Sequence, residues 1–151
     1  MTASPANGDR DVLHGPATEP DRYERGLQTL TAVDGEAGQR VLESLADIAP
    51  ALAQHVVAYG FGDVYARPGL TPGQRQLVTL GMLTALGGCE PQLEVHIGAA
   101  LNVGLSTTEI VEALIHAAVY CGFPKSLNAM SVAKRVFAER DLLPVTARTT
   151  V

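Results

Sequence analysis

The sequence predicts an all-α fold, and three observations lead to this prediction. Apolar residues between positions 21 and 143 recur at the three- and four-residue spacing of amphipathic helices. Pairs such as Thr71–Pro72 and Gly87–Gly88 are typical of helix starts and helix ends. No convincing segment alternates apolar and polar residues as a half-buried strand does. One helical domain over residues 21–143 is therefore expected.

The N-terminal half of this domain contains three apolar segments separated by turn residues. Asp21 is the expected N-cap of the first helix. The second follows a glycine-containing turn and ends before Pro50, and the third is predicted to break near Gly60 and Gly62. In order, the segments are "RYERGLQTLTAV", "GQRVLESLADIA" and "ALAQHVVAYGFGDVY".

The C-terminal half carries clearer boundary signals. Thr71 is an expected N-cap with Pro72 in the first helical position. Ser106 and Glu109 have the spacing of a capping box, in which the serine accepts from the backbone and the glutamate accepts in return. Gly122 interrupts the chain before the last helix. The helices predicted here span residues 72–86, 91–103, 107–121 and 125–141.

Bulk composition is that of an ordinary globular domain. The 151 residues are 46% hydrophobic and 18% charged, with a formal net charge of −5, and this length supports a real core. Lys and Arg form no cluster or stripe, which argues against nucleic-acid binding. No leader segment and no apolar run near about 18 residues is visible, so we expect a cytoplasmic protein without a membrane partner.

The two ends differ in composition from the domain. Residues 1–20 are rich in Pro, Gly and Asp and offer little to bury, so we expect a flexible N-terminal arm. Residues 144–151, "PVTARTTV", have a similar character and are expected to form a flexible tail.

The predicted helix 107–121 is apolar on nearly all sides, which predicts burial partly against another subunit. The small residues at 98–100 would let a second helix approach closely, so helices 91–103 and 107–121 are expected to line an oligomer core. Glu112, His116 and Tyr120 are spaced four apart and form one polar stripe. Such a stripe is either a solvated edge or the wall of a polar cavity.

The segment 87–104 places Cys89 seven residues before His96, with two glutamates between them. This combination is compatible with a metal site, a thiol redox site or an acid–base site, and it is also compatible with residues that have no functional role. His96 lies at the edge of the apolar face, where a histidine is either a hydrogen-bonded core residue or a reactive group. Cys89 precedes a helix N-terminus, which favours a thiolate, yet it can also be an ordinary loop residue. Cys121 is 32 residues away and no CxxC pair exists, so no structural metal site is expected.

Several motifs occur together in a defined order. They are "RPGL" at 67–70, "HIGAALNVG" at 96–104, "STTEIVEALIH" at 106–116 and "YCGFPKSLNA" at 120–129. With this order the chain resembles the carboxymuconolactone decarboxylase family of the alkylhydroperoxidase D-like superfamily, over roughly residues 22–139.

The resemblance implies an all-helical subunit in a homo-oligomer, either a trimer or a hexamer, with no metal and no organic cofactor. It also implies decarboxylation or a proton-shifting isomerisation of a small cyclic or carbonyl-bearing carboxylic acid. His96 occupies the histidine of the family's "HxxxAL" motif, and this position implies a general acid/base. His116 occupies the histidine that ends the "EVLxH" motif.

The other expected roles follow from that reaction. Glu112 and His116 would form a polar wall opposite the general acid/base, and Tyr120 would donate to a developing oxyanion. Arg75, or less favourably Lys125, would hold an acidic group of the substrate.

This chain departs from both branches of the superfamily. In the peroxidase motif CxxCxxxH the first position is Cys89 but the second is Gln92, and Gln76 stands where that branch has a glutamate. Muconolactone enzymes commonly carry an arginine two residues after the motif histidine, where this chain has Gly98. A changed small-molecule substrate is the favoured interpretation. The alternatives are a single-cysteine redox protein that uses Cys89 and a non-catalytic ligand-binding member of the family.

Overall fold

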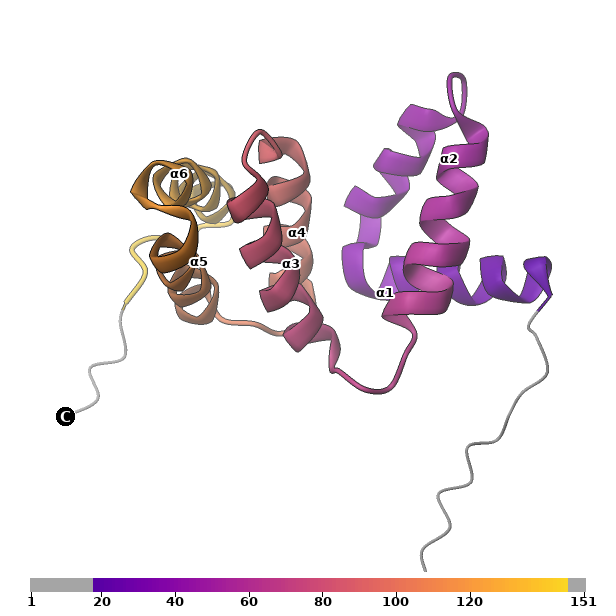
Figure 1. Cartoon of the computed structure of the whole chain (residues 1–151), viewed down its shortest axis with the longest axis horizontal. Coiled ribbons are helices and arrows are strands. Elements are labelled where there is room, and N and C mark those ends of the chain that lie inside the picture. Colours follow the sequence, from indigo (N-terminus) through magenta and orange to yellow (C-terminus); the bar gives the residue numbers. More distant parts are fainter. Residues whose placement is uncertain (1–17, 147–151) are drawn as a thin grey trace, which may run out of the picture.

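The computed structural model describes residues 18–146, and throughout this range the regular structure is helical. The all-α prediction is therefore confirmed. Figure 1 shows two groups of helices side by side, with α1 and α2 in one and α3 to α6 in the other. The helices are α1 (Glu19–Leu45), α2 (Pro50–His55), η1 (Val56–Tyr65), α3 (Pro72–Leu86), α4 (Glu90–Asn102), α5 (Thr107–Cys121) and α6 (Phe123–Glu139).

Helix α4 joins the two groups because it contributes to both hydrophobic cores. Ile97 and Ala100 are fully buried in the larger core, which α3, α4, α5 and α6 form. Ala99 is buried in the smaller core, against Leu30 and Val57 of the N-terminal helices. The small residues of α4 thus serve close packing inside one subunit.

Helix α1 begins earlier than the sequence analysis predicted. Thr18 is its N-cap and accepts from the backbone N–H of Asp21, while the Asp21 carboxylate accepts from the Thr18 backbone. Asp21 is therefore the third residue of a capping box and not the cap itself, a correction to the prediction. The helix kinks at Gly35, whose φ of 58° places it in the left-handed region that glycine tolerates best.

The predicted break near Gly60 and Gly62 is wrong, because α2 continues without interruption into the π-helix η1. Gly60 and Gly62 differ in their surroundings, because nothing lies within 4 Å of a Cβ atom built on Gly60. A Cβ atom built on Gly62 would overlap the carbonyl oxygen of Arg22, and one on Gly26 would overlap the carbonyl oxygen of Val57. Gly26 and Gly62 therefore permit the backbones of α1 and η1 to cross in direct contact.

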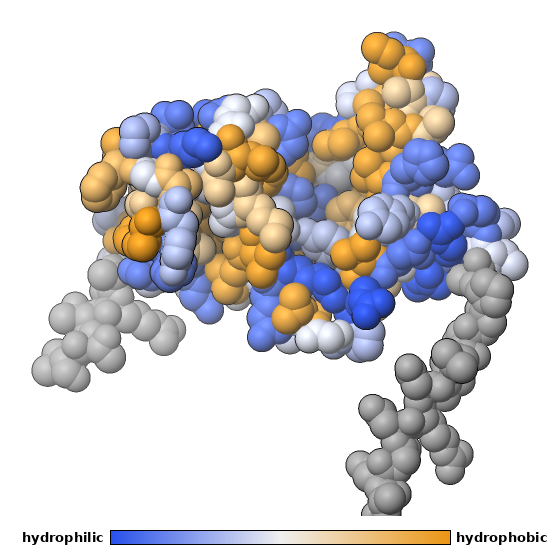
Figure 2. Space-filling model, viewed as in Figure 1, coloured by the Kyte–Doolittle hydropathy of each residue, from blue (hydrophilic) through white to orange (hydrophobic). Residues whose placement is uncertain are grey.

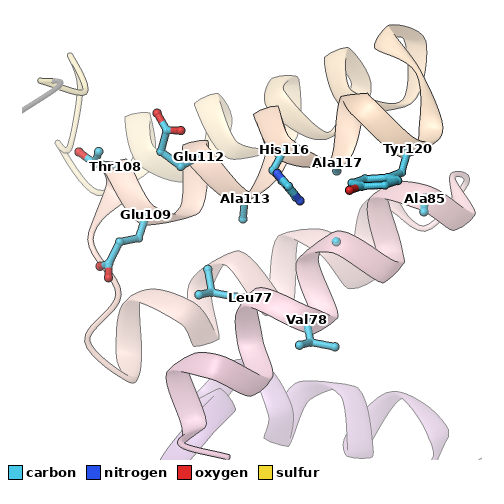
Figure 3. A pocket seen from close by; sticks show the side chains of 11 residues that line it. Leu77, Val78, Ala85, Thr108, Glu109, Glu112, Ala113, His116, Ala117 and Tyr120 are labelled. Carbon is cyan, nitrogen blue, oxygen red and sulfur yellow. The ribbon is translucent and has the colours of Figure 1, made fainter.

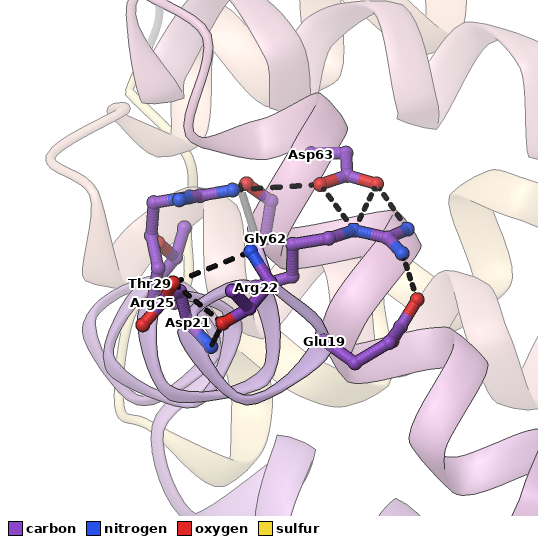
Figure 4. Close-up of polar contacts among 8 residues, drawn as sticks. Glu19, Asp21, Arg22, Arg25, Thr29, Gly62 and Asp63 are labelled. Atoms are coloured by element: carbon purple, nitrogen blue, oxygen red, sulfur yellow. Dashed lines mark hydrogen bonds and ion pairs between the residues drawn. The ribbon is translucent and has the colours of Figure 1, made fainter. Parts of the chain in front are cut away.

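Charged side chains reinforce this crossing (Figure 4). The Arg22 Nε donates to both carboxylate oxygens of Asp63 at 3.0 Å, and the Arg25 Nε donates to the Gly62 carbonyl at 2.7 Å. The Arg22 hydrogen bonds hold the pKa of Asp63 below its usual value. Helix η1 is thereby held in place against the first half of α1.

The later boundaries agree closely with the sequence. Thr71 and Ser106 both cap their helices with complete capping boxes, and α3 and α5 end at Gly87 and Gly122 as predicted. The last helix begins at Phe123, two residues before the predicted start, with its proline in the first turn. These signals are local, so the sequence is sufficient to place them.

Most of the predicted arm and tail, residues 1–17 and 147–151, lies outside the described residues. Within the described part, Thr18 caps α1, and Val145 packs against the larger core while the Thr146 carbonyl accepts from the Thr108 hydroxyl at 3.4 Å. Across residues 18–146, no helix has both the length and the apolar character needed to cross a membrane.

Candidate active site

A cleft of about 580 Å³ lies between the N-terminal helices and the first half of α4, and we call it the His96 cleft. Two titratable side chains line it, His96 from α4 and Asp34 from α1. Its remaining lining is mainly apolar. That lining includes Leu30, Val41, Leu45, Leu52, Val56 and Phe61.

His96 is held in a defined orientation by a residue from the neighbouring helix. Its Nδ1 lies 3.1 Å from the Oε1 of Gln76, which is fully buried on α3. In this orientation of the Gln76 amide the oxygen faces Nδ1 and can only accept, which is the arrangement for a proton on Nδ1 and a lone pair on Nε2. Burial lowers the pKa of His96 from its ordinary value, which favours the neutral imidazole.

Asp34 is the site residue that the sequence analysis missed. Its side chain is only 6% exposed, and its Oδ1 has no hydrogen-bond partner among the described residues. Burial raises the pKa of this carboxyl to about 6. The sequence did contain a signal that Asp34 is buried. Asp34 directly follows Val33 and lies four residues after Leu30, on the buried face of its helix.

Arg75, the expected carboxylate ligand, does not line the His96 cleft. Its Nη2 donates to the Arg67 carbonyl at 2.8 Å, and its buried Nε has no partner among the described residues. Its backbone carbonyl accepts from Thr79, whose hydroxyl also lies 2.9 Å from the hydroxyl of Tyr65. The guanidinium of Arg75 thus bonds to the backbone of the segment that connects η1 and α3.

Glu112, His116 and Tyr120 come together in a different place. They line a mainly apolar groove of about 630 Å³ between α3 and α5 (Figure 3). All three are exposed, and the rings of His116 and Tyr120 lie 5.4 Å apart. Within one subunit the stripe is therefore a solvated edge, and it does not face His96.

Cys89 and Lys125 lie at helix ends near the turn between α3 and α4. Cys89 is the N-cap residue of α4, and its thiol donates weakly to the Gly87 carbonyl at 3.5 Å. The Lys125 ammonium donates to the Ala85 and Leu86 carbonyls at the C-terminus of α3, where a cation stabilises the helix dipole. Cys89 and Cys121 are free thiols. In residues 18–146 no three or more His, Cys, Asp or Glu side chains are grouped to hold a metal ion.

A helical fold with a half-buried histidine in a cleft fits one class of known proteins, which the sequence comparisons identify. The family model for the carboxymuconolactone decarboxylase family matches residues 50–135. The 4-carboxymuconolactone decarboxylase of Acinetobacter baylyi is 36% identical over 127 residues, which cover 83% of this chain and 94% of that protein. The chain therefore belongs to the carboxymuconolactone decarboxylase family.

Two further relatives share less of their length with this chain. Nitrosuccinic acid decarboxylase npaB of Metarhizium robertsii is 42% identical over 82 residues, or 53% of this chain and 55% of that protein. An uncharacterized 15.0 kDa protein of Paracoccus denitrificans is 30% identical over 101 residues, or 66% of this chain and 75% of that protein. Two relatives are thus named as decarboxylases, and their names give different acids.

Proposed function

We propose that this chain is a cofactor-independent lyase that decarboxylates a small cyclic or carbonyl-bearing carboxylic acid, with His96 as the general acid/base. The observation that carries the proposal is the oriented, largely buried imidazole in a cleft of small-molecule size. The relatives that are named as decarboxylases support the reaction class.

The reaction needs one proton and one place for a pair of electrons. When the carbon–carbon bond to the carboxylate breaks, CO2 leaves and the electron pair is delocalised into an adjacent electron-accepting group. A proton must then be placed on the carbon that carried the carboxylate. In the free protein the imidazole of His96 is neutral, but a bound carboxylate favours its protonated form. The imidazolium then donates its proton to that carbon.

The apolar wall of the His96 cleft supports the bond-breaking step. A carboxylate has a concentrated charge, whereas the departing CO2 is neutral and the delocalised carbanion that remains has a dispersed charge. Leu52, Val56 and Phe61 line this wall with groups that offer a carboxylate no hydrogen bond. An apolar environment of this kind favours the dispersed charge of the transition state relative to the bound carboxylate.

We also propose that the subunits form a homo-oligomer, a trimer or a hexamer, through the groove between α3 and α5. Hydrophobic surface over these helices is visible in Figure 2. Val78, Met82 and Leu86 recur every four residues along α3 and are 48%, 63% and 69% exposed. Val119 of α5 is 75% exposed. Apolar surface on this scale is typical of a protein–protein contact, and association would bury the Glu112, His116 and Tyr120 stripe.

Light scattering coupled to size-exclusion chromatography tests this assembly. The wild-type protein is expected to elute as a trimer or hexamer at micromolar concentration, and Val119→Asp should dissociate it because a carboxylate would be buried in the contact. Ile48→Asp, in the turn after α1, is a matched control at a similarly exposed apolar side chain and should leave the mass unchanged. A stable wild-type monomer would refute the oligomer.

The reaction itself is tested by product analysis in D2O. The purified protein is incubated with 4-carboxymuconolactone, nitrosuccinic acid and a set of small cyclic and β-carbonyl acids, and CO2 release and proton NMR are followed. The expected result is CO2 release with one deuterium on the carbon that carried the carboxylate. Deuterium incorporation without CO2 would indicate an isomerase, and no turnover of any acid would contradict the proposal.

A further inference from the structure

Arg140, which directly follows α6, lies over Gly98 of α4, two residues after the candidate histidine His96. A Cβ atom built on Gly98 would lie 2.9 Å from the Nη2 of Arg140, and the other described atom near that position is the guanidinium carbon of Arg140. Arg140 follows the last turn of α6 as its C-cap residue. The guanidinium therefore occupies the space that a longer side chain at position 98 would otherwise fill.

This guanidinium lines a second cavity, of about 440 Å³, which adjoins the His96 cleft. Gly98 and Asn102 of α4 form one side, and Arg40 of α1 lies on another. The two cavities share five lining residues and so lie side by side, and together they give a space with an apolar end at His96 and a polar end at Arg140. The shared residues are Asp34, Val41, Ser44, Pro91 and Val95.

The charged groups around the polar end are not equally available. Glu94 is bound by Arg135 at 2.5 Å, and Arg40 lies 3.7 Å from the exposed Glu36. The guanidinium of Arg140, by contrast, has no hydrogen-bond or ion-pair partner within residues 18–146. Glu139 and Asp34 also line this cavity, so the polar end contains both signs of charge.

We propose that Arg140 binds a carboxylate of the substrate at the polar end of this space, and so fixes a second acidic group away from His96. The chemical class of ligand is a small dicarboxylate. The identity of the ligand as a substrate rests on the proposed function, whereas the binding of a dicarboxylate by Arg140 does not.

The geometry suits this role for two reasons. A guanidinium forms charge-assisted, often bidentate hydrogen bonds with a carboxylate, and the one on Arg140 is free to do so. The backbone at Gly98 adds no side chain that would block the approach, and the Asn102 amide, on the same face one turn later, adds a polar group. Asp34 repels a bound anion when ionised, and because burial raises its pKa to about 6 this repulsion is weakest below that pH.

Calorimetry with succinate tests the proposal without turnover, because succinate has no carbonyl or nitro group adjacent to a carboxylate-bearing carbon through which it would lose CO2. Succinamide is the neutral probe of the same length. The wild-type protein is expected to bind succinate and not succinamide, and Arg140→Ala should weaken succinate binding by roughly 10- to 100-fold. Lys134→Ala removes the same charge from an exposed position on the same helix and should change the affinity less than about twofold.

A second variant moves the arginine to α4. The double variant Arg140→Ala/Gly98→Arg should recover at least about a third of the wild-type succinate affinity, because the space at position 98 is then vacant. Equal losses in Arg140→Ala and Lys134→Ala would overturn the proposal, since they would indicate only long-range attraction. Undetectable binding of succinate to the folded wild-type protein would overturn it as well.

The outcomes separate this inference from the proposed function. Arg140-dependent succinate binding without decarboxylation of any acid would support the inference and contradict the proposed function. Decarboxylation with the same KM in the wild type and in Arg140→Ala would support the proposed function and contradict the role of Arg140. Circular dichroism and thermal unfolding of each variant check that the fold is retained.

Discussion

The Nδ1 of His96 lies 3.1 Å from the Oε1 of Gln76, although the two residues are on different helices and 20 positions apart. With the amide oxygen facing Nδ1, Nε2 is the imidazole nitrogen that the proposed function makes the proton-transfer atom. The contact also explains how a neutral histidine is kept in one orientation beside an apolar wall.

Replacing His96 should remove most of the activity. His96→Ala is expected to lower kcat by about 10²- to 10⁴-fold, the usual contribution of a positioned acid or base. His116→Ala should cost less, or act mainly on KM, because His116 lines the other groove. His55→Ala is a control at an exposed histidine on α2. Wild-type kcat in a folded His96→Ala protein would remove His96 from the mechanism.

Substituting Gln76 by glutamate should change the titration of His96. A carboxylate beside Nδ1 favours the imidazolium, so the pKa of His96 is expected to rise relative to the wild type, where burial lowers it. The measurement is the pH dependence of the His96 ring signals in NMR. Gln74→Glu is the matched control, since Gln74 is exposed and bonded to Thr71 on the same helix. An unchanged His96 titration in Gln76→Glu would show that the contact does not exist in solution.

Loss of the Cys89 thiol should have little effect. Cys89→Ser is expected to retain activity within about tenfold, because Gln92 stands where a partner cysteine would be needed for a disulfide cycle. The measurement is kcat/KM on whichever acid is turned over, together with peroxidase activity of the wild type. Complete inactivation of a folded Cys89→Ser protein would favour the redox interpretation.

Asp34 should make the protein less stable as the pH rises. Its pKa is raised from 3.8 in the unfolded chain to about 6 in the folded state, so the folded state binds more protons between these values. The stability is highest below pH 3.8 as far as this group is concerned, falls as the pH rises to about 6, and stays reduced above it. A shift of this size corresponds to on the order of 2–3 kcal/mol. Asp34→Asn should remove this decrease.

Urea unfolding of the wild type and Asp34→Asn at pH 5 and pH 7.5 measures the difference. His96 contributes in the opposite direction, because its lowered pKa makes the folded state lose stability as the pH falls below about 6.5. That contribution is common to both proteins, so it cancels in the comparison. Parallel pH dependences of the two proteins would contradict the assignment of a raised pKa to Asp34.

The crossing of α1 and η1 should depend on Gly62. A methyl group at this position would overlap the Arg22 carbonyl oxygen, so Gly62→Ala is expected to cost at least about 2 kcal/mol of unfolding free energy. Gly60→Ala is the matched control two residues away, since nothing lies within 4 Å of its added carbon. Thermal unfolding of both variants makes the comparison. Equal melting temperatures would show that the backbones separate easily.

The helical class and most of the helix boundaries could be predicted from the sequence alone. Thr71 and Ser106 were recognised as caps because a cap bonds to the backbone only two or three residues away. The family motifs likewise indicated His96, which the structure places in a cleft. Interactions between residues that lie this close in the sequence can be predicted from residue type and spacing.

The groups that surround His96 could not be predicted, because they come from helices that meet only when the chain is folded. Asp34, Gln76 and His96 belong to three helices, and the His116 stripe that the sequence placed opposite His96 lies in another groove. The predicted break near Gly62 failed for a similar reason, since that glycine serves a crossing with α1. Periodicity gives the face of a helix on which a side chain lies, but not the helix that packs against that face. That choice depends on packing between segments far apart in the chain, which no local pattern specifies.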